Sequence, residues 1–238
     1  MYLKLSRGRC AALGPIVLTA AVIGCTAHAN DAATMVREQI ESRGIKDPAV
    51  LQSLRNTPRH LFVPVWVRGL AYTDQPLPIG HGATISQPYI VALMTELLEP
   101  SKGLTVLEIG TGSGYQAAVL SPLVKHVYTM EIVPELARSA RAALEKLGYK
   151  NISVRSGNGY KGWPEKAPFD RILLTAAPPE IPRTLISQLR PGGKLVAPVG
   201  DYMQTLVVID KSEDGKIARH PVIPVRFVPM VKGVKAHK

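Results

Sequence analysis

The sequence predicts an α/β fold in which a mostly parallel, doubly wound sheet carries helices on both faces. Two observations predict it. Short apolar runs alternate with amphipathic helical patterns between residues 104 and 199, as expected for parallel strands joined by crossover helices. A glycine-rich turn, residues 110–114, joins the first of these runs to the helical pattern that follows. Ligands of such sheets bind beyond the carboxyl ends of the strands, so we expect the functional residues there.

The first 29 residues have the pattern of a secretory signal peptide. Basic residues at positions 4–9 precede an apolar stretch, 11–25, and an Ala-His-Ala cleavage site follows at 27–29. The apolar stretch is too short for a membrane-spanning helix. We therefore expect export, to a bacterial periplasm, of a chain that begins at Asn30. A leader that is not processed would leave the protein in the cytoplasm.

Residues 22–25, Val-Ile-Gly-Cys, also resemble a bacterial lipobox, so a lipid anchor at Cys25 competes with cleavage after Ala29. Both cysteines of the chain, Cys10 and Cys25, lie in the leader. The mature chain would then have no disulfide, no thiolate nucleophile and no cysteine-based metal site. The histidines do not fall at metal-ligand spacings, and we expect no metal.

Residues 30–238 read as one domain, since no Gly/Ser-rich linker divides them. Within it, residues 30–100 predict a helical cap with a substrate loop, and residues 101–238 a catalytic core. The cap begins with a helical pattern over 31–43, for which Asp31 is the expected N-cap, and a second short helix starts at Asp47.

A loop rich in Gly and Pro, residues 78–88, connects the cap to a helix expected from about 87 to 99. Ser86 is the expected N-cap of this helix, and its buried face is predicted to consist of Ile90, Leu93, Met94 and Leu97. A capped helix start with free N–H groups is also able to bind a carboxylate.

Further strands and helices are expected in alternation through the core. Strands are predicted at 104–109, 126–130, 152–154, 169–175 and 194–199, helices at 134–147 and 181–189, a turn at 190–193, and a closing antiparallel pair at 205–210 and 222–228.

The glycine-rich turn indicates a nucleoside ligand. Gly110, Gly112 and Gly114 alternate, whereas the dinucleotide fingerprint is G-x-G-x-x-G. Glu108 precedes the turn, and Glu131 ends the second strand about twenty residues further on, where a carboxylate suits two ribose hydroxyls. The plain alternative is a glycine turn that serves only strand–helix packing.

Seven segments together resemble one family. They are TISQPY (84–89), VLEIGTGSGYQAAVL (106–120), VYTMEIV (127–133), GWPEKAPFD (162–170), TAAPPEIP (175–182), RPGGKLVAPVG (190–200) and VRFVPMVKG (225–233). The sequence resembles the protein-L-isoaspartate O-methyltransferases, a family of the class I S-adenosylmethionine-dependent methyltransferases. The resemblance implies a Rossmann-like methyltransferase sheet and S-adenosyl-L-methionine as the cofactor.

The resemblance also implies roles for individual residues. The catalytic residue is Ser86. The cofactor-binding residues are Glu108, Gly110, Thr111, Gly112, Gly114, Glu131, Asn158, Gly159 and Thr175. The substrate-binding residues are Thr84, Ile85, Ala177, Val225, Arg226 and Phe227. Asn158 departs from the family, which usually has Asp there; Asn is still able to accept a hydrogen bond from an adenine amine.

The implied reaction methylates the free α-carboxylate of isoaspartyl residues in proteins and peptides, by a monomeric enzyme that binds no nucleic acid. That carboxylate is ionised at neutral pH, so no general base is needed. Two alternatives remain open. The net charge of +11 suits a nucleic-acid methyltransferase, although the fourth strand ends in Thr-Ala-Ala-Pro where such enzymes usually have Asp/Asn-Pro-Pro-aromatic. An exported binding protein that has lost catalysis is the other.

Overall fold

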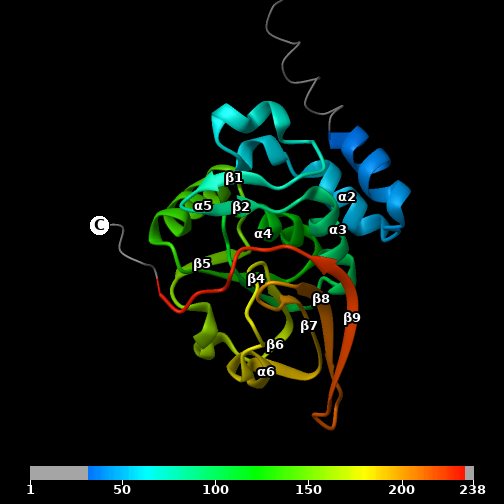
Figure 1. Cartoon of the computed structure of the whole chain (residues 1–238), viewed down its shortest axis with the longest axis vertical. Helices are drawn as coiled ribbons and strands as arrows, with labels where there is room; N and C mark the ends of the chain where they lie inside the picture. The colour runs from blue at the N-terminus through cyan, green and yellow to red at the C-terminus, as the bar shows by residue number, and fades with distance from the viewer. Residues whose placement is uncertain (1–31, 234–238) are drawn as a thin grey trace, which may run out of the picture.

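The computed structural model describes residues 32–233, and the leader, with its expected cleavage and lipidation sites, lies outside the described residues, as does the expected cap Asp31. A seven-stranded sheet runs through the molecule in the order β5-β4-β3-β6-β7-β8-β9 (Figure 1). Its strands are β3 (Thr105–Ile109), β4 (His126–Glu131), β5 (Ile152–Ser156), β6 (Phe169–Leu174), β7 (Leu189–Val199), β8 (Gln204–Lys211) and β9 (Ile217–Val225).

The first five strands of this sheet are parallel, and β8 and β9 are antiparallel, which confirms the predicted fold class. After the N-terminal helical turns, the α-helices are α2 (Pro48–Asn56), α3 (Pro88–Leu97), α4 (Tyr115–Leu120), α5 (Pro134–Lys146) and α6 (Arg183–Gln188). Short 3-10 helices are η2 (Glu41–Arg43), η3 (Arg59–Phe62), η4 (Val65–Leu70), η5 (Ser121–Leu123), η6 (Gly159–Lys161) and η7 (Pro164–Lys166).

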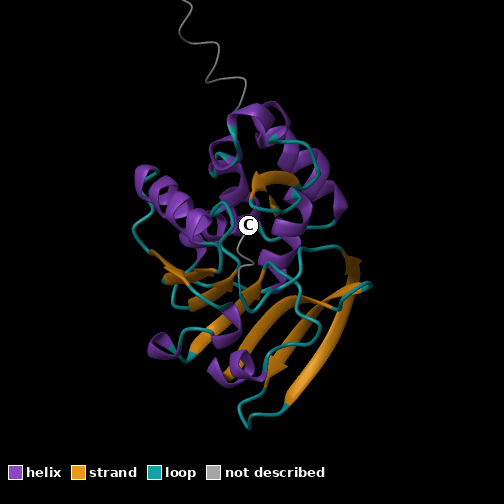
Figure 2. Ribbon diagram, turned by 60° about the vertical axis from the view of Figure 1, so that its left-hand side comes forward, coloured by secondary structure: helices purple, strands orange, loops and turns teal. Residues whose placement is uncertain are grey.

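Helices cover the two faces of the sheet unequally (Figure 2). Alternate strand residues enter two separate cores: Val106 packs with the cap, α3 and α4, whereas Leu107 packs with α6 on the opposite face. Burying each such aliphatic side chain stabilises the fold by about 1.5–3 kcal/mol. The sheet therefore holds the cap and the core together as one packed body. Over residues 32–233, no helix has the length and apolar character needed to span a bilayer.

The N-terminal cap forms largely as predicted. Residues 32–35 are α-helical and continue through a π-helix, η1 (Val36–Ile40), and η2 until Gly44 ends the run at φ 98°. Helix α2 begins after Asp47, whose carboxylate accepts hydrogen bonds from the backbone N–H groups of Ala49 and Val50.

Helix α3 differs from the prediction at its start. Its N-cap is Gln87, not Ser86, and neither the Gln87 side chain nor Ser86 caps it. Asp74, from the preceding loop, accepts the hydrogen bond of the Tyr89 backbone N–H at 3.0 Å instead. Because Pro88 is the first helical residue, Ser86 lies one position too early to act as the cap.

The buried face of α3 is also rotated from the prediction. Val91, Met94 and Thr95 are fully buried, whereas Ile90 and Leu93 are only partly buried. The predicted face was read from apolar residues alone. Thr95 was missed because its hydroxyl is satisfied internally by the Val91 carbonyl, at 2.7 Å.

Three further segments correct the predicted boundaries. The loop at 78–88 contains a hairpin of β1 (Leu77–Gly80) and β2 (Ala83–Ile85). The turn predicted at 190–193 lies inside β7 as a bulge, since Phe169 pairs with Leu189 but Arg171 pairs with Lys194. The strand predicted at 222–228 is β9, which starts earlier and ends at Val225.

Candidate active site

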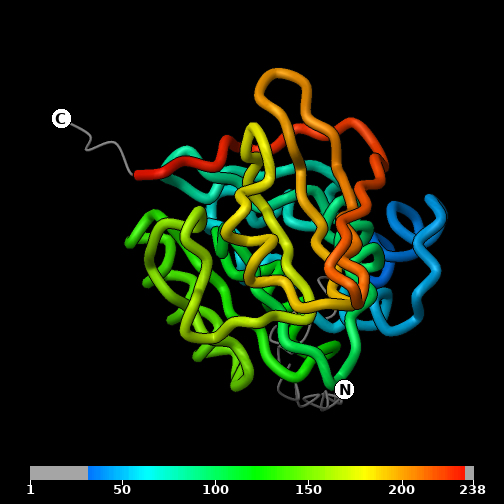
Figure 3. The backbone as a smooth tube through the Cα atoms, turned by 90° about the horizontal axis from the view of Figure 1, so that it is seen from below, coloured from blue at the N-terminus to red at the C-terminus, as the bar shows by residue number. Residues whose placement is uncertain are grey.

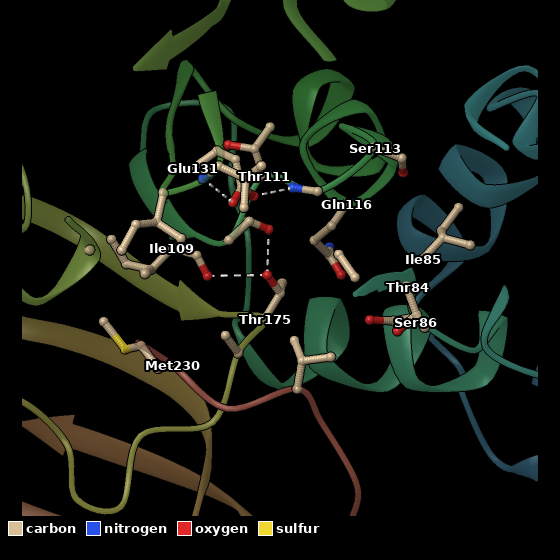
Figure 4. Close-up of a pocket in the computed structure, with 18 of the residues that line it drawn as sticks. Thr84, Ile85, Ser86, Ile109, Thr111, Ser113, Gln116, Glu131, Thr175 and Met230 are labelled. Atoms are coloured by element: carbon tan, nitrogen blue, oxygen red, sulfur yellow. Dashed lines mark hydrogen bonds between the residues drawn. The ribbon is translucent and has the colours of Figure 1, made fainter. Parts of the chain in front are cut away.

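Two adjoining cavities lie beyond the carboxyl ends of the central strands. The first has a volume of about 300 Å³ and is lined by the glycine turn, the end of β4, the hairpin and residues 228–231 (Figure 4). The second is a groove of about 450 Å³ along residues 224–228. Both are lined by Thr84, Ser86, Thr175 and Val228, which therefore mark the junction between them.

The glycine turn requires glycine for backbone and packing reasons at once. Gly110 has φ 103°, and a Cβ there would lie 2.4 Å from the Thr175 Oγ1 atom. That hydroxyl lies 2.5 Å from the Gly110 carbonyl oxygen and 3.1 Å from the Ile109 carbonyl oxygen, so Thr175 joins the end of β6 to the turn (Figure 4). Gly112 (φ 53°) and Gly114 (φ 87°) also lie in the left-handed region.

Glu131 is fixed at the wall of the first cavity. Its Oε2 atom accepts a hydrogen bond from the Gly112 backbone N–H at 2.8 Å, and its Oε1 atom accepts one from the Val133 N–H at 3.0 Å. Each carboxylate oxygen retains a further lone pair. A cavity-facing carboxylate held in this way fits a nucleoside whose ribose donates two hydroxyls.

Glu108 and Thr111 have different positions relative to the cavity. Thr111 lines it, and its hydroxyl hydrogen-bonds with Thr129 Oγ1 at 2.7 Å. Glu108 is fully buried in β3, lies outside the lining, and has no hydrogen-bond partner for either carboxylate oxygen. Burial raises the pKa of Glu108 to about 8. The neighbouring Thr129 hydroxyl favours the ionised carboxylate and lowers the pKa in part, whereas the negative charge of Glu131 raises it further.

Asn158 is already engaged by the backbone. Its Oδ1 atom accepts from the Tyr160 N–H, and its Nδ2 atom donates to the Lys232 carbonyl, both at 2.9 Å. It therefore ties the loop after β5 to the C-terminal segment and does not line the cavity. Gly159 does line it, and a Cβ at Gly159 would lie 2.3 Å from the Ile109 Cγ2 atom.

The hairpin and the entry to α3 form the other wall. Thr84, Ile85 and Ser86 all line the first cavity, and Ser86 lies across it from Thr175 (Figure 4). The Ser86 backbone carbonyl accepts a hydrogen bond from Arg59 at 2.7 Å.

The chain after β9 forms the outer wall of the groove. Val225, Arg226 and Phe227 line the groove, and Arg226 is exposed. Phe227 is fixed by Gln204, whose Oε1 accepts the Phe227 N–H at 2.6 Å and whose Nε2 donates to its carbonyl at 3.1 Å. The segment then crosses the strand ends beside the hairpin (Figure 3).

Ala177 is buried and lies outside both linings. Its backbone makes two hydrogen bonds to the segment after β9. The Ala177 N–H donates to the Val228 carbonyl at 2.9 Å, and the Ala177 carbonyl accepts from the Met230 N–H at 2.7 Å. Sequence reasoning missed residues 228–231 as cavity lining. The VRFVPMVKG motif contained the signal, but only its first three residues were assigned.

Comparison with known proteins agrees with this geometry. A family model described as "Protein-L-isoaspartate(D-aspartate) O-methyltransferase (PCMT)" matches residues 30–235. The chain is 52% identical to "Protein-L-isoaspartate O-methyltransferase 1" of Nitrosospira multiformis, over 84% of this chain and 86% of the relative. It is 53% identical to the protein-L-isoaspartate O-methyltransferase of Gloeobacter violaceus, over 83% and 97%.

Solved structures agree as well. A protein-L-isoaspartate O-methyltransferase aligns with a TM-score of 0.77 at 27% identity, over 87% of this chain and 67% of that one. A Plasmodium falciparum structure described as a putative protein-L-isoaspartate O-methyltransferase, in complex with S-adenosyl-L-homocysteine, aligns with a TM-score of 0.73 at 26% identity, over 85% and 99%. No three metal-ligating side chains come together within residues 32–233. The chain belongs to the protein-L-isoaspartate(D-aspartate) O-methyltransferase family.

Proposed function

We propose that this protein methylates the free α-carboxylate of L-isoaspartyl residues in damaged proteins and peptides, with S-adenosyl-L-methionine as the methyl donor. The observation that carries the proposal is the position of Ser86, which lines both the enclosed cavity and the open groove. In this proposal the donor occupies the cavity and the peptide occupies the groove, so that their reacting groups meet at Ser86.

The residues of the first cavity suit the donor. The Glu131 carboxylate accepts from the ribose, the glycine turn allows close approach of the methionine end, and Gly159 with Ile109 and Met230 supplies an apolar wall for the base. When bound, S-adenosyl-L-methionine supplies an electrophilic methyl group on a sulfonium sulfur, which leaves as a neutral thioether.

The acceptor needs alignment rather than activation. An isoaspartyl residue leaves its α-carboxylate free, with a pKa of about 3.5, so it is already a nucleophilic anion at neutral pH. The protein's task is to hold one carboxylate oxygen in line with the methyl group and to exclude water. Ser86, as the catalytic residue, donates a hydrogen bond to the carboxylate, and Thr84 and residues 225–227 hold the flanking peptide. The backbone nitrogen of the following residue then attacks the methyl ester and expels methanol, which gives a succinimide. Water reopens the succinimide in part to normal aspartate, and this initiates repair.

The protein works, in this proposal, as a monomeric single domain over residues 30–238, exported to the periplasm by the signal peptide. Lipidation at Cys25 is the alternative fate of the leader. The intact mass of the protein purified from its host distinguishes the two. A chain starting at Asn30 supports cleavage after Ala29, whereas a diacylated chain starting at Cys25 contradicts it.

Methyl transfer to matched peptides tests the activity. The chain from Asn30 is incubated with methyl-labelled S-adenosyl-L-methionine and two peptides that differ only in isoaspartate or aspartate at one site. We expect base-labile label on the isoaspartyl peptide alone. Equal label on both peptides, or on neither, would contradict the proposed function.

A further inference from the structure

Arg59 is a fully buried cation that lies directly behind the junction of the two cavities. Its side chain is 0% exposed. Its Nε atom donates to the Ala71 carbonyl and its Nη2 atom donates to the Ser86 carbonyl, both at 2.7 Å. Its Cζ atom lies 4.8 Å from the ring centroid of Tyr115, which lines the first cavity.

The charge of Arg59 has no ion-pair partner among residues 32–233. The Nη1 atom is buried without a hydrogen-bond partner, as is the Tyr115 hydroxyl. Asp74 is the acid that acts on Arg59 through space, but its oxygens are engaged by Arg43, Gln87 and Tyr89. Burial lowers the pKa of Arg59 from its ordinary value, but an arginine side chain stays protonated inside proteins at neutral pH.

A buried charge without a counter-ion is costly unless something compensates it. Two backbone carbonyls compensate part of the cost. A guanidinium is not required for that purpose alone, since a neutral donor would satisfy the same carbonyls without the cost of a buried charge. The acceptor of the proposed reaction is itself an anion that binds next to Ser86. The carboxylate of a bound acceptor would therefore supply a negative charge close to the guanidinium of Arg59.

We propose that Arg59 is a positioning residue with two effects: it fixes the Ser86 backbone, and its unpaired charge makes the groove select an anionic acceptor over a neutral one. This inference rests on the proposed function. It adds a source of selectivity for the carboxylate that lies outside the cavity lining and never touches the substrate.

The test compares an acid with its neutral isostere. One peptide carries an isoaspartyl residue with its α-carboxylate, and the other carries the α-carboxamide at the same site. Both dissociation constants are measured on enzyme saturated with S-adenosyl-L-homocysteine, so that no transfer occurs. The readout is the ratio of the two dissociation constants. A general loss of structure weakens the binding of both peptides and leaves this ratio unchanged.

Three variants separate charge from packing. Arg59→Met removes the charge, and we expect the preference for the acid to fall by about tenfold, the scale of one charge acting through a protein interior. Arg59→Lys keeps the charge but loses the bridge between two carbonyls, and we expect it to keep most of the preference while turnover falls. Arg171→Met is the matched control. Arg171 also donates to a distant carbonyl, that of Leu98 at 2.7 Å, and lines neither cavity, so the ratio should not change.

Binding of S-adenosyl-L-homocysteine reports whether each variant is folded. If Arg59→Met fails to bind it, Arg59→Lys decides the matter, because loss of the acid preference in that charged variant would overturn the inference. An unchanged ratio in folded Arg59→Met would overturn it too. These outcomes leave the proposed function standing. The proposed function itself fails if wild-type enzyme labels neither peptide of the methyl-transfer assay, or labels the isoaspartyl and aspartyl peptides equally.

Discussion

The Oδ1 atom of Asp74 accepts the backbone N–H of Tyr89 at 3.0 Å and so caps helix α3 from a loop fifteen residues upstream. The Oδ2 atom accepts from Gln87 Nε2 and from Arg43 Nη1, both at 2.6 Å. The start of α3 is thus already occupied by a carboxylate of the protein itself. For the proposed reaction we therefore expect the substrate carboxylate at Ser86 and the groove, and not at the helix N-terminus that the sequence suggested.

Asp74→Ala should lower the free energy of unfolding by about 1–2 kcal/mol, because it removes the cap of α3. Asp74→Asn is the matched control, since its side-chain oxygen is still able to cap, and it should retain most of the stability. Urea denaturation of the chain from Asn30 measures both. Equal stability of Asp74→Ala and wild type would show that the capping bond contributes nothing.

Glu131→Gln should weaken S-adenosyl-L-homocysteine binding by at least about tenfold, since an amide replaces one of two oxygens that each accept a backbone N–H and face the cavity. Isothermal titration measures the affinity. Glu135→Gln, four residues on, removes an exposed acid paired with Arg138 and should leave the affinity unchanged. Similar losses in the two variants would mean that Glu131 has no specific role.

Gly110→Ala should abolish cofactor binding and destabilise the fold. Gly44→Ala separates the causes, because Gly44 has a similar φ of 98° but nothing within 4 Å of an added Cβ, whereas Gly110 would meet Thr175 at 2.4 Å. Thermal unfolding should show a larger loss for Gly110→Ala than for Gly44→Ala. Losses of the same size would assign the whole effect to backbone strain.

Glu108 should make the cofactor-free protein less stable as the pH rises. Burial raises its pKa to about 8, while an unfolded chain has an ordinary value of about 4.3. Between these values the folded state retains a proton that the unfolded state has lost, so the free energy of unfolding falls with rising pH and levels off above pH 8. Denaturant titrations from pH 5 to pH 9 measure this. Glu108→Gln should remove that decline, and parallel profiles for variant and wild type would disprove the assignment.

Local chemistry made much of the fold predictable. Apolar runs and the glycine turn located β3, β4 and α5 within a few residues, because strand ends and helix stops depend on neighbouring residues. The cavity-lining positions of Glu131, Gly110 and Gly112 follow from the same local pattern. Each belongs to the turn or to the strand next to it.

Contacts between distant segments were not predictable from one sequence. Three such contacts join parts of the chain that no periodicity connects. Asp74 caps α3, residues 228–231 cross the strand ends, and Asn158 hydrogen-bonds to the Lys232 carbonyl. Arg59 was missed for the same reason. A lone arginine in the segment Pro-Arg-His carries no sign that it is fully buried.

The effect of Ser86→Ala on turnover tests the central claim most directly, namely that the acceptor carboxylate is held where the two cavities meet. The measurement is single-turnover methyl transfer to the isoaspartyl peptide, alongside the dissociation constant for S-adenosyl-L-homocysteine. We predict that transfer slows by about ten- to a hundredfold, since a hydrogen bond to a charged group is lost, while cofactor affinity stays within about twofold. Unchanged transfer in a folded, cofactor-binding variant would contradict the claim.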